Sequence, residues 1–258
     1  NLDSYPVLIP TDNNMPNFYK LIDRAVQDKL TFIADPILDP ISYGFTKSIE
    51  RYIYLREKYP DIHIMIGIGN ITELTHADTS GINMIMLGIV EELKLNHILT
   101  TQVSRHCSTV IRETDLARRI IHAASENNIT PKHINNGLLI NHGHKDYAYT
   151  SDELSDMKSN IKDKNYRIYV NDDGVHLFNK TIYKVFSDPY DFYEFLEVDE
   201  DSGHSFYLGV ELARAQIAYQ LRKEYSQDEE LDWGCLIDKK ADNKLQSKEL
   251  GPTFKKRK

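Results

Sequence analysis

The chain has 258 residues and a mass of 29.9 kDa, with 41% hydrophobic and 27% charged residues. This composition is typical of globular proteins and excludes a wholly disordered chain. No run approaches about 18 uncharged apolar residues, so the sequence shows no membrane-spanning helix. The net charge is −8, an acidic balance that argues against a general nucleic-acid-binding protein, because phosphates need cationic grooves.

The first half alternates short apolar runs with stretches of helical periodicity, which predicts four consecutive strand–helix units. The predicted strands are Tyr5–Pro10, Leu30–Asp35, Ile62–Gly67 and Asn96–Gln102. The predicted helices are Pro16–Val26, Thr46–Lys58, Gly81–Leu93 and Ser108–Asn127.

Such an alternation indicates an α/β fold with a parallel sheet. Successive strands lie 25 to 35 residues apart, and a (β/α)8 barrel uses roughly 31 residues per unit. An open doubly wound sheet fits the spacing equally well. Four units make only half of a barrel, and the chain starts at Asn1 rather than Met and soon enters an apolar run. We therefore expect a fragment of a longer protein.

The second half has a different pattern. Residues 131–164 are polar and are interpreted as a linker with a short helix at Ser151–Ile161. Two apolar runs around the sequence NDDG predict a β-hairpin, with a further strand at Ile182–Phe186, and Ser205–Tyr225 predicts a buried helix. The predicted domains are therefore residues 1–130, the linker 131–164, a small α+β domain at 165–238 and a tail at 239–258.

The tail 239–258 carries eight Lys or Arg against two acidic residues, a net charge of +6 that leaves −14 for the rest. We expect it to be disordered and solvated; contact with RNA or an anionic surface is the alternative. Two cysteines cannot build a disulfide framework, and no signal peptide leads the sequence, so we expect a cytoplasmic protein.

Polar residues follow each predicted strand, where α/β proteins bind ligands. Asp12 and Asn13 follow the first strand and Asp35 ends the second, before Pro36. The Asp35 carboxylate could accept two parallel hydrogen bonds from a guanidinium or from the N–H edge of a heterocycle. An ordinary turn or helix-capping role for Asp35 is the alternative.

Asn70 follows the third strand, in the sequence GIGN. Its amide could donate to and accept from a ring that bears nitrogens and carbonyls, although a turn residue is the alternative. Arg105 and His106 follow the fourth strand and could hold a phosphate together with the next helix N-terminus, or lie in an exposed loop.

The sequence offers two further candidates, a metal site and a reactive thiol, and each has a simpler structural explanation. His142, His144 and Asp146 have the residue types of metal ligands, but no matching Cys or His cluster surrounds them, and we predict no metal site. Cys107 starts a predicted helix, which can lower a thiol pKa, whereas a buried structural role is more common.

The segment Ala34–Asp78 resembles the pterin-binding family, which includes dihydropteroate synthases and corrinoid-linked tetrahydrofolate methyltransferases. The resemblance lies in a strand ending in Asp-Pro, an amphipathic helix, and a strand ending in GIGN. More closely, Tyr5 to Cys235 is similar to the dihydropteroate synthase-like proteins associated with tetrahydromethanopterin biosynthesis. Their poorly characterised C-terminal domain resembles Phe206–Leu221 and Glu229–Cys235.

The resemblance implies the C-terminal part of a pterin-binding (β/α)8 barrel, followed by a small α+β domain. Asp35 would hold the amino-pyrimidine edge of the pterin and Asn70 would face the reduced ring, with Asp12 and Asn13 nearby. The reaction would join a hydroxymethyl-dihydropterin diphosphate to an arylamine. Diphosphate would leave with help from a cation such as Mg²⁺ or from basic residues, and Arg105 and His106 are candidates for that contact.

The sequence also departs from the family. GIGNITE stands where conventional synthases have Ser-Arg-Lys, so a pterin-binding lysine is missing, and TTQVSRH replaces an Arg-x-His pair. Two alternatives thus stay open: methyl transfer from a methylated pterin, and a non-catalytic pterin-binding accessory protein. No resident cofactor has an evident motif. The expected partners are a pterin and an arylamine, with neither nucleic acid nor membrane, and a homodimer remains open.

Overall fold

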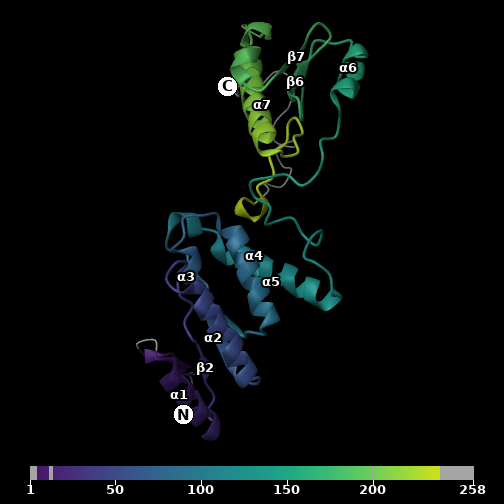
Figure 1. Cartoon of the computed structure of the whole chain (residues 1–258). Coiled ribbons are helices and arrows are strands. Elements are labelled where there is room, and N and C mark those ends of the chain that lie inside the picture. Colours follow the sequence, from purple (N-terminus) through teal and green to yellow (C-terminus); the bar gives the residue numbers. More distant parts are fainter. Residues whose placement is uncertain (1–4, 12–13, 199, 239–258) are drawn as a thin grey trace. The chain divides into compact units, whose positions relative to one another are not determined.

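The computed structural model describes residues 5–11, 14–198 and 200–238, and its chain divides into two compact units, Asn1–Leu138 and Leu139–Lys258 (Figure 1). The predicted tail 239–258 lies outside the described residues. The protein is a mixed α/β structure, with a parallel sheet in unit 1 and an antiparallel sheet in unit 2. Within the described part of the chain, no helix is long and apolar enough to span a membrane.

Unit 1 holds a parallel sheet whose strands follow the chain order β1-β2-β3-β4, so that each helix crossover connects neighbouring strands. The strands are β1 (Val7–Leu8), β2 (Ile33–Ala34), β3 (His63–Gly67) and β4 (His97–Leu99). The helices are α1 (Met15–Gln27), α2 (Phe45–Lys58), α3 (Gly69–Thr72), α4 (Thr79–Glu92), the 3-10 turn η2 (Arg105–Cys107) and α5 (Val110–Asn127).

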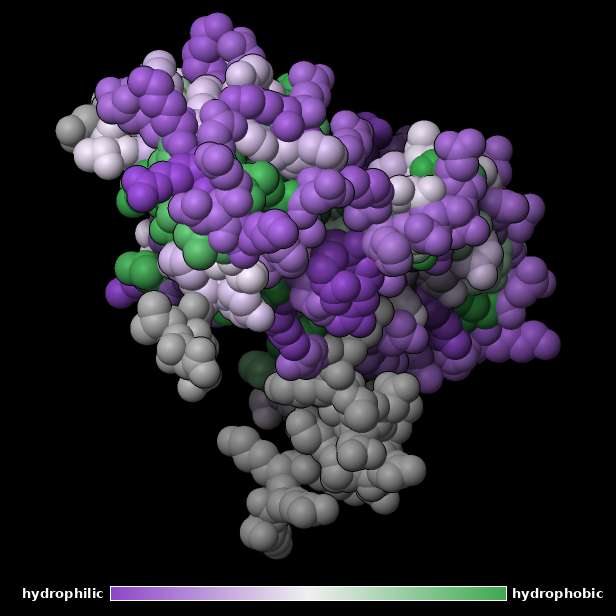
Figure 2. Space-filling view, turned by 90° about the horizontal axis from the view of Figure 1, so that it is seen from below, coloured by the Kyte–Doolittle hydropathy of each residue, from purple (hydrophilic) through white to green (hydrophobic). Residues whose placement is uncertain are grey.

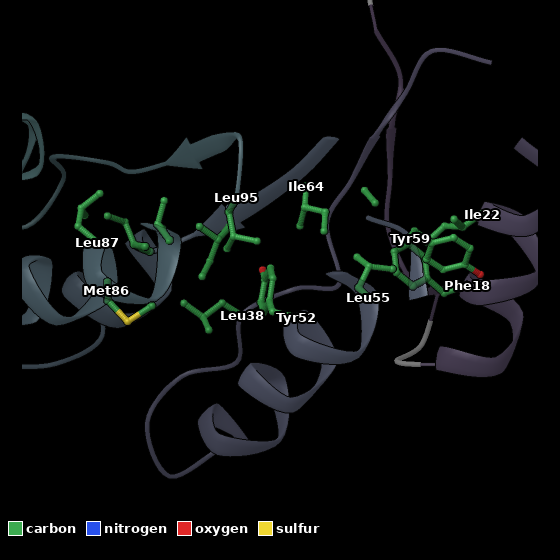
Figure 3. Close-up of a cluster of buried hydrophobic side chains, with 14 of the residues drawn as sticks. Phe18, Ile22, Leu38, Tyr52, Leu55, Tyr59, Ile64, Met86, Leu87 and Leu95 are labelled. Carbon is green, nitrogen blue, oxygen red and sulfur yellow. The ribbon is translucent and has the colours of Figure 1, made fainter. Parts of the chain in front are cut away.

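One face of this sheet is covered by helices. Ala34, Ile64 and Ile66 are fully buried in a hydrophobic core shared with α1, α2, α4 and α5. In Figure 3, Tyr52 of α2 lies beside Leu38, and the core continues toward α1 on one side and α4 on the other. Burial of this apolar surface is the main favourable contribution to folding of unit 1.

The opposite face of the sheet stays accessible. Val7 and Leu99 point to this face, as the register with β2 and β3 requires, and they are 43% and 52% exposed. His63 and His97 meet there, with 3.0 Å between Nδ1 and Nε2. Hydrophobic side chains also form patches on the surface drawn in Figure 2.

Helices α4 and α5 pack closely, and a buried carboxylate joins them. Glu113 of α5 is 1% exposed. It accepts hydrogen bonds from Thr79 Oγ1 (2.7 Å) and Asn83 Nδ2 (2.8 Å) of α4, and from Thr109 Oγ1 (2.8 Å) of its own helix start. Three donors compensate for the removal of the carboxylate from water.

Unit 2 holds an antiparallel sheet of order β5-β6-β7, which packs on the long helix α7 around its own hydrophobic core. Its elements are α6 (Ser151–Ser159), β5 (Arg167–Asn171), β6 (Gly174–Phe178), β7 (Tyr183–Phe186), η3 (Pro189–Phe195), α7 (Ser202–Leu221) and η4 (Gly234–Leu236). The predicted hairpin is confirmed, since β5 and β6 pair across Asp172 and Asp173.

Local capping explains where the predicted boundaries were wrong. Helix α7 begins at Ser202, before the predicted start, because the side chain of Asp201 accepts from His204 N at 2.9 Å. It ends at Leu221 rather than Tyr225, because Arg222 has a left-handed backbone with φ 52°. The 3-10 turns η2, η3 and η4 were not predicted, and the predicted helix start at Ser108 falls between η2 and α5.

A turn at GIGN was the alternative interpretation of the sequence, and the structure has the short helix α3 there instead. Ile68 and Ile71 are buried and anchor this helix in the core, and Glu73 N donates to Gly69 O at 2.9 Å. The strands of the parallel sheet are shorter than the apolar runs that predicted them, because only part of each run pairs with a neighbour.

We predict that Glu113→Ala lowers the free energy of unfolding by about 3 kcal/mol, because it leaves the buried donors of Thr79 and Asn83 without an acceptor. Glu113→Gln keeps one acceptor oxygen and should lose about 1 kcal/mol. Urea unfolding measures both. Glu126→Ala, at an exposed position of the same helix, is the control and should change little. Wild-type stability of Glu113→Ala would contradict this role.

Candidate functional site

A pocket of about 270 Å³ lies at the carboxyl-terminal ends of β2, β3 and β4 in unit 1. Asp35 and Asn70, two of the predicted site residues, both line it. The full lining consists of Asp35, Ile37, Leu38, Gly67, Gly69, Asn70, Glu73, Leu74, Leu99 and Thr101. The parallel sheet thus brings together residues that are far apart in sequence, as expected for this architecture.

Asp35 is 8% exposed and directly follows β2. Its Oδ1 accepts hydrogen bonds from Ile37 N at 2.8 Å and from the Tyr52 hydroxyl at 3.0 Å. Among the described residues, none donates to Oδ2. From the sequence, we expected both oxygens of Asp35 to accept hydrogen bonds from a ligand. Only Oδ2 is free to do so, because Oδ1 already has two donors.

The environment of Asp35 favours its neutral form. Burial raises the pKa of this carboxyl above its ordinary value of 3.8, while the Ile37 and Tyr52 hydrogen bonds and the charge of Arg51 partly oppose the shift. A ligand that donates N–H groups to Oδ2 would favour the ionised form instead. Binding of such a ligand and ionisation of Asp35 are therefore coupled.

Helix α2 holds the loop that carries Asp35. Ser48, Arg51 and Tyr52 lie on one face of α2 and all contact this loop. Arg51 Nη2 donates to Ile37 O at 2.6 Å and pairs with Asp39 Oδ2 at 2.7 Å, and the Ser48 hydroxyl accepts from Asp39 N at 3.1 Å.

Ile37 has a left-handed backbone with φ 63°, which is rare for a β-branched residue. Such a conformation persists only where the surrounding contacts hold it, and strained residues of this kind concentrate at functional sites. The three α2 side chains supply these contacts. The strained backbone of Ile37 therefore indicates a functional site at this pocket, and this indication does not depend on the polar side chains of the lining.

Asn70 lies in α3 and contacts the loop that carries Asp35. Its Nδ2 donates to Leu38 O at 2.7 Å, which leaves the side-chain oxygen for a ligand. Gly69 lets the next strand end come close, because a Cβ there would lie 3.0 Å from Thr101 Oγ1. Gly69 of GIGN thus serves close packing around the pocket, whereas a Cβ at Gly67 would meet nothing within 4 Å.

Glu73 fixes the loop after β4. Its two oxygens accept from Val103 N and Ser104 N, both at 2.8 Å, and from Thr101 Oγ1 at 3.0 Å. These hydrogen bonds hold the pKa of Glu73 at about 2, well below its ordinary 4.5. Glu73 is therefore ionised at neutral pH and adds negative charge to the pocket wall.

Arg105 and His106, the predicted phosphate contacts, lie in η2 and do not line the pocket. Arg105 is exposed, and His106 Nε2 lies 3.0 Å from Thr72 O. Helix α5 begins only at Val110, so the two side chains precede its N-terminus by several residues. Cys107 is buried and its pKa is raised to about 11, mainly by burial, which does not suit a nucleophile.

The other predicted candidates among the described residues do not line this pocket. Asp12 and Asn13 lie outside the described residues. His142 Nδ1 lies 3.3 Å from Leu221 O in unit 2. Over the described ranges, no group of three or more His, Cys, Asp or Glu side chains is arranged to hold a metal ion, including His144 and Asp146.

Sequence reasoning did not assign roles to Arg51, Tyr52 and Glu73. For Arg51 and Tyr52, a signal in the sequence is their spacing with Ser48, which places all three on one face of a predicted helix. The role of Glu73 depends on a loop about thirty residues away and leaves no local pattern.

The pocket combines a buried carboxyl, an amide oxygen and an ionised glutamate. None of the described residues that line it is Lys or Arg. This set of groups favours a ligand rich in N–H donors and disfavours a phosphate at the centre of the pocket.

The chain matches no protein-family model. It is similar to a protein of Methanocaldococcus jannaschii that bears the name uncharacterized protein MJ0107, with 30% identity over 241 residues. The match covers 83% of this chain and 45% of that relative, so the chain spans less than half of the relative's length. The relative's name states no activity, and the pocket geometry is the basis for a functional proposal.

We predict that Asp35→Asn is more stable than the wild type at pH 7. Because the pKa of Asp35 is raised, the folded protein keeps a proton that the unfolded chain releases, and stability falls as pH rises from 3.8 through the raised value. Asparagine keeps the Oδ1 acceptor and cannot ionise. Urea midpoints at pH 3.5 and pH 7 should show an advantage only at pH 7; a lower midpoint for the variant at pH 7 would contradict this.

We also predict that the amide protons of Val103 and Ser104 report the ionisation of Glu73. Their NMR shifts should titrate with a midpoint near pH 2 instead of 4.5. Ionised Glu73 contributes to stability above pH 4.5, and this contribution is lost as the pH falls toward 2. The titration should disappear in Glu73→Gln. A midpoint near pH 4.5 would show that the hydrogen bonds from Val103 and Ser104 to Glu73 do not form in solution.

Proposed function

We propose that the unit 1 pocket binds a reduced pterin, and that the protein is an enzyme resembling dihydropteroate synthases. The observation that carries the proposal is that the buried Asp35 and Asn70 line one pocket, and that the hydrogen bonds among the described residues use Asp35 Oδ1 and Asn70 Nδ2 and leave Asp35 Oδ2 and the Asn70 side-chain oxygen for a ligand. The amino-pyrimidine edge of a pterin offers adjacent N–H donors, which match one carboxylate oxygen and one amide oxygen.

The reaction would form a bond between an arylamine nitrogen and the exocyclic methylene carbon of a hydroxymethyl-dihydropterin diphosphate. The carbon–oxygen bond to diphosphate breaks, the leaving group takes its electron pair, and the amine loses a proton to solvent. The residues around the pocket would orient the pterin and stabilise charge, and no protein nucleophile is needed.

We further propose that the four strand–helix units form half of a (β/α)8 barrel. The strand order β1-β2-β3-β4 and the helices on one face are the arrangement of a singly wound barrel. The accessible second face, with Val7 and Leu99 partly exposed, is the face that would line a barrel interior. The longer relative has room for further units.

A second candidate function is pterin binding without catalysis. It is favoured by the lining of the pocket, where none of the described residues is a Lys or Arg that could stabilise a departing diphosphate. Arg105 and His106 would have to supply that charge from outside the pocket. In this second function, the protein would act as a binding component for a pterin-handling partner.

Calorimetric titration of the chain with 6-hydroxymethyl-7,8-dihydropterin tests the binding proposal. We expect Asp35→Asn to weaken binding at least tenfold, since the amide presents a donor where the ligand also donates. Asn70→Ala should weaken it about fivefold, through loss of one hydrogen bond. Asp61→Asn, the same change at an exposed site before β3, is the matched control.

The pH dependence provides a second readout. Wild-type affinity should rise with pH through the raised pKa of Asp35, whereas the affinity of Asp35→Asn should stay flat. Equal affinity of the wild type and Asp35→Asn would show that the pocket assignment is wrong. Incubation with the pterin diphosphate and 4-aminobenzoate, followed by ³¹P NMR, then separates the two functions: released diphosphate supports the enzyme, and binding without release supports the accessory protein.

A further inference from the structure

Unit 2 contains a second pocket, of about 460 Å³, beside the outer edge of its antiparallel sheet. Strand β5 pairs with β6 on one side only, so its other side is a sheet edge. The pocket lies between this edge and two chain segments, residues 147–149 before α6 and residues 224–227 after α7. It belongs wholly to unit 2 and shares no residue with the Asp35 pocket.

The backbone groups of β5 that point to the open edge belong to alternate residues. Ile168 N donates to Gln227 Oε1 at 3.0 Å on this side, which fixes the outward direction. Tyr166 and Val170, two residues away on either side, therefore point the same way. The edge offers two successive pairs of groups: Tyr166 C=O with Ile168 N–H, and Ile168 C=O with Val170 N–H.

The first pair is already satisfied by a side-chain amide. Gln227 accepts from Ile168 N through Oε1 and donates to Tyr166 O through Nε2 at 3.2 Å. Its carboxamide thus replaces a neighbouring strand. The protein itself demonstrates that a planar group with an adjacent C=O and N–H fits this edge.

The second pair faces the pocket. Ile168 and Val170 line it, and among the described residues no backbone group pairs with them across the edge. On the strand's far end, Asn171 Nδ2 contacts Tyr149 O at 3.5 Å. Gln227 closes the first pair, and β5 ends at Asn171, so the Ile168 C=O and Val170 N–H groups are the one complete pair that stays open within this strand.

The walls of the pocket are aromatic. Tyr149 lies edge-to-face against Tyr169, with ring centroids 5.5 Å apart, and Tyr147 and Tyr225 also line the pocket. The Tyr147 hydroxyl is buried and has no hydrogen-bond partner among the described residues, so the wall carries one polar group whose capacity is unused. Glu224, Ser226 and Gln227 add further polar groups to the lining, and aromatic side chains combined with polar groups that fix orientation are typical of small-molecule sites.

We propose that this pocket binds a small, flat molecule through a carboxamide or lactam edge. The ligand's carbonyl accepts from Val170 N–H and its own N–H donates to Ile168 C=O, in the way that Gln227 pairs with the preceding groups. An added peptide strand would need several successive open pairs. The single open pair therefore favours a small molecule over a strand.

NMR titration of the ¹⁵N-labelled chain with benzamide tests this proposal. Benzamide should shift the Val170 amide resonance and bind with a dissociation constant of about 1 mM, as expected for a fragment. N,N-dimethylbenzamide has the same ring and carbonyl but lacks the N–H donor, and should bind at least about fivefold more weakly. Equal binding of the two compounds, or no shift at Val170, would overturn the proposal.

Two variants at the same position sharpen the test. Val170→Pro removes the outward N–H, a change that edge strands tolerate, and should abolish benzamide binding. Val170→Ala keeps the N–H and should retain affinity within about twofold; loss of binding there as well would assign the effect to packing and contradict the proposal. An acetylated tripeptide amide that binds and shifts Tyr166 and Ile168 would indicate strand addition and also overturn it.

Discussion

The hydrogen bond from Tyr52 to Asp35 connects the hydrophobic core of unit 1 to its pocket. Tyr52 is fully buried on α2, so its ring cannot move without disturbing the core between β2, β3 and α4. Its hydroxyl, at the other end of the ring, fixes one carboxyl oxygen. Packing of α2 on the sheet thereby sets the position of the carboxyl group to which we assign ligand recognition, and Arg51 from the same helix holds the strained backbone at Ile37.

Much of the fold follows from local patterns in the sequence. Apolar runs at strand period and stripes at helical period predicted the four strand–helix units and the antiparallel hairpin, because burial of one face dictates both periods. The order of the strands and the side on which the helices lie required the structure. The exact ends of a helix depended on single capping residues, such as Asp201 and Arg222 at the two ends of α7. The apolar pattern does not reveal the effect of such a residue on the backbone, so the predicted ends were wrong.

The site was predictable only where architecture alone brings residues together. Asp35 and Asn70 follow adjacent parallel strands, and any parallel sheet would place them at one edge; their role in binding stays a prediction. The left-handed backbone of Ile37 and the hold of Glu73 on residues 101–104 arise from contacts between distant segments. No periodicity in the sequence encodes such contacts. Arg105 and His106 were grouped with the site by sequence order alone, and the structure places them outside the pocket.

The buried Glu113 determines how two helices align as well as how firmly they associate. Helix α4 is apolar around much of its circumference, and apolar surfaces of this kind can slide or rotate against a partner with little change in energy. Directional hydrogen bonds from Thr79 and Asn83 to one carboxylate permit a single register. The chain leads from α4 directly into β4, whose end forms one wall of the pocket. The polar contact between α4 and α5 therefore limits how far the end of β4, and with it one wall of the pocket, can shift.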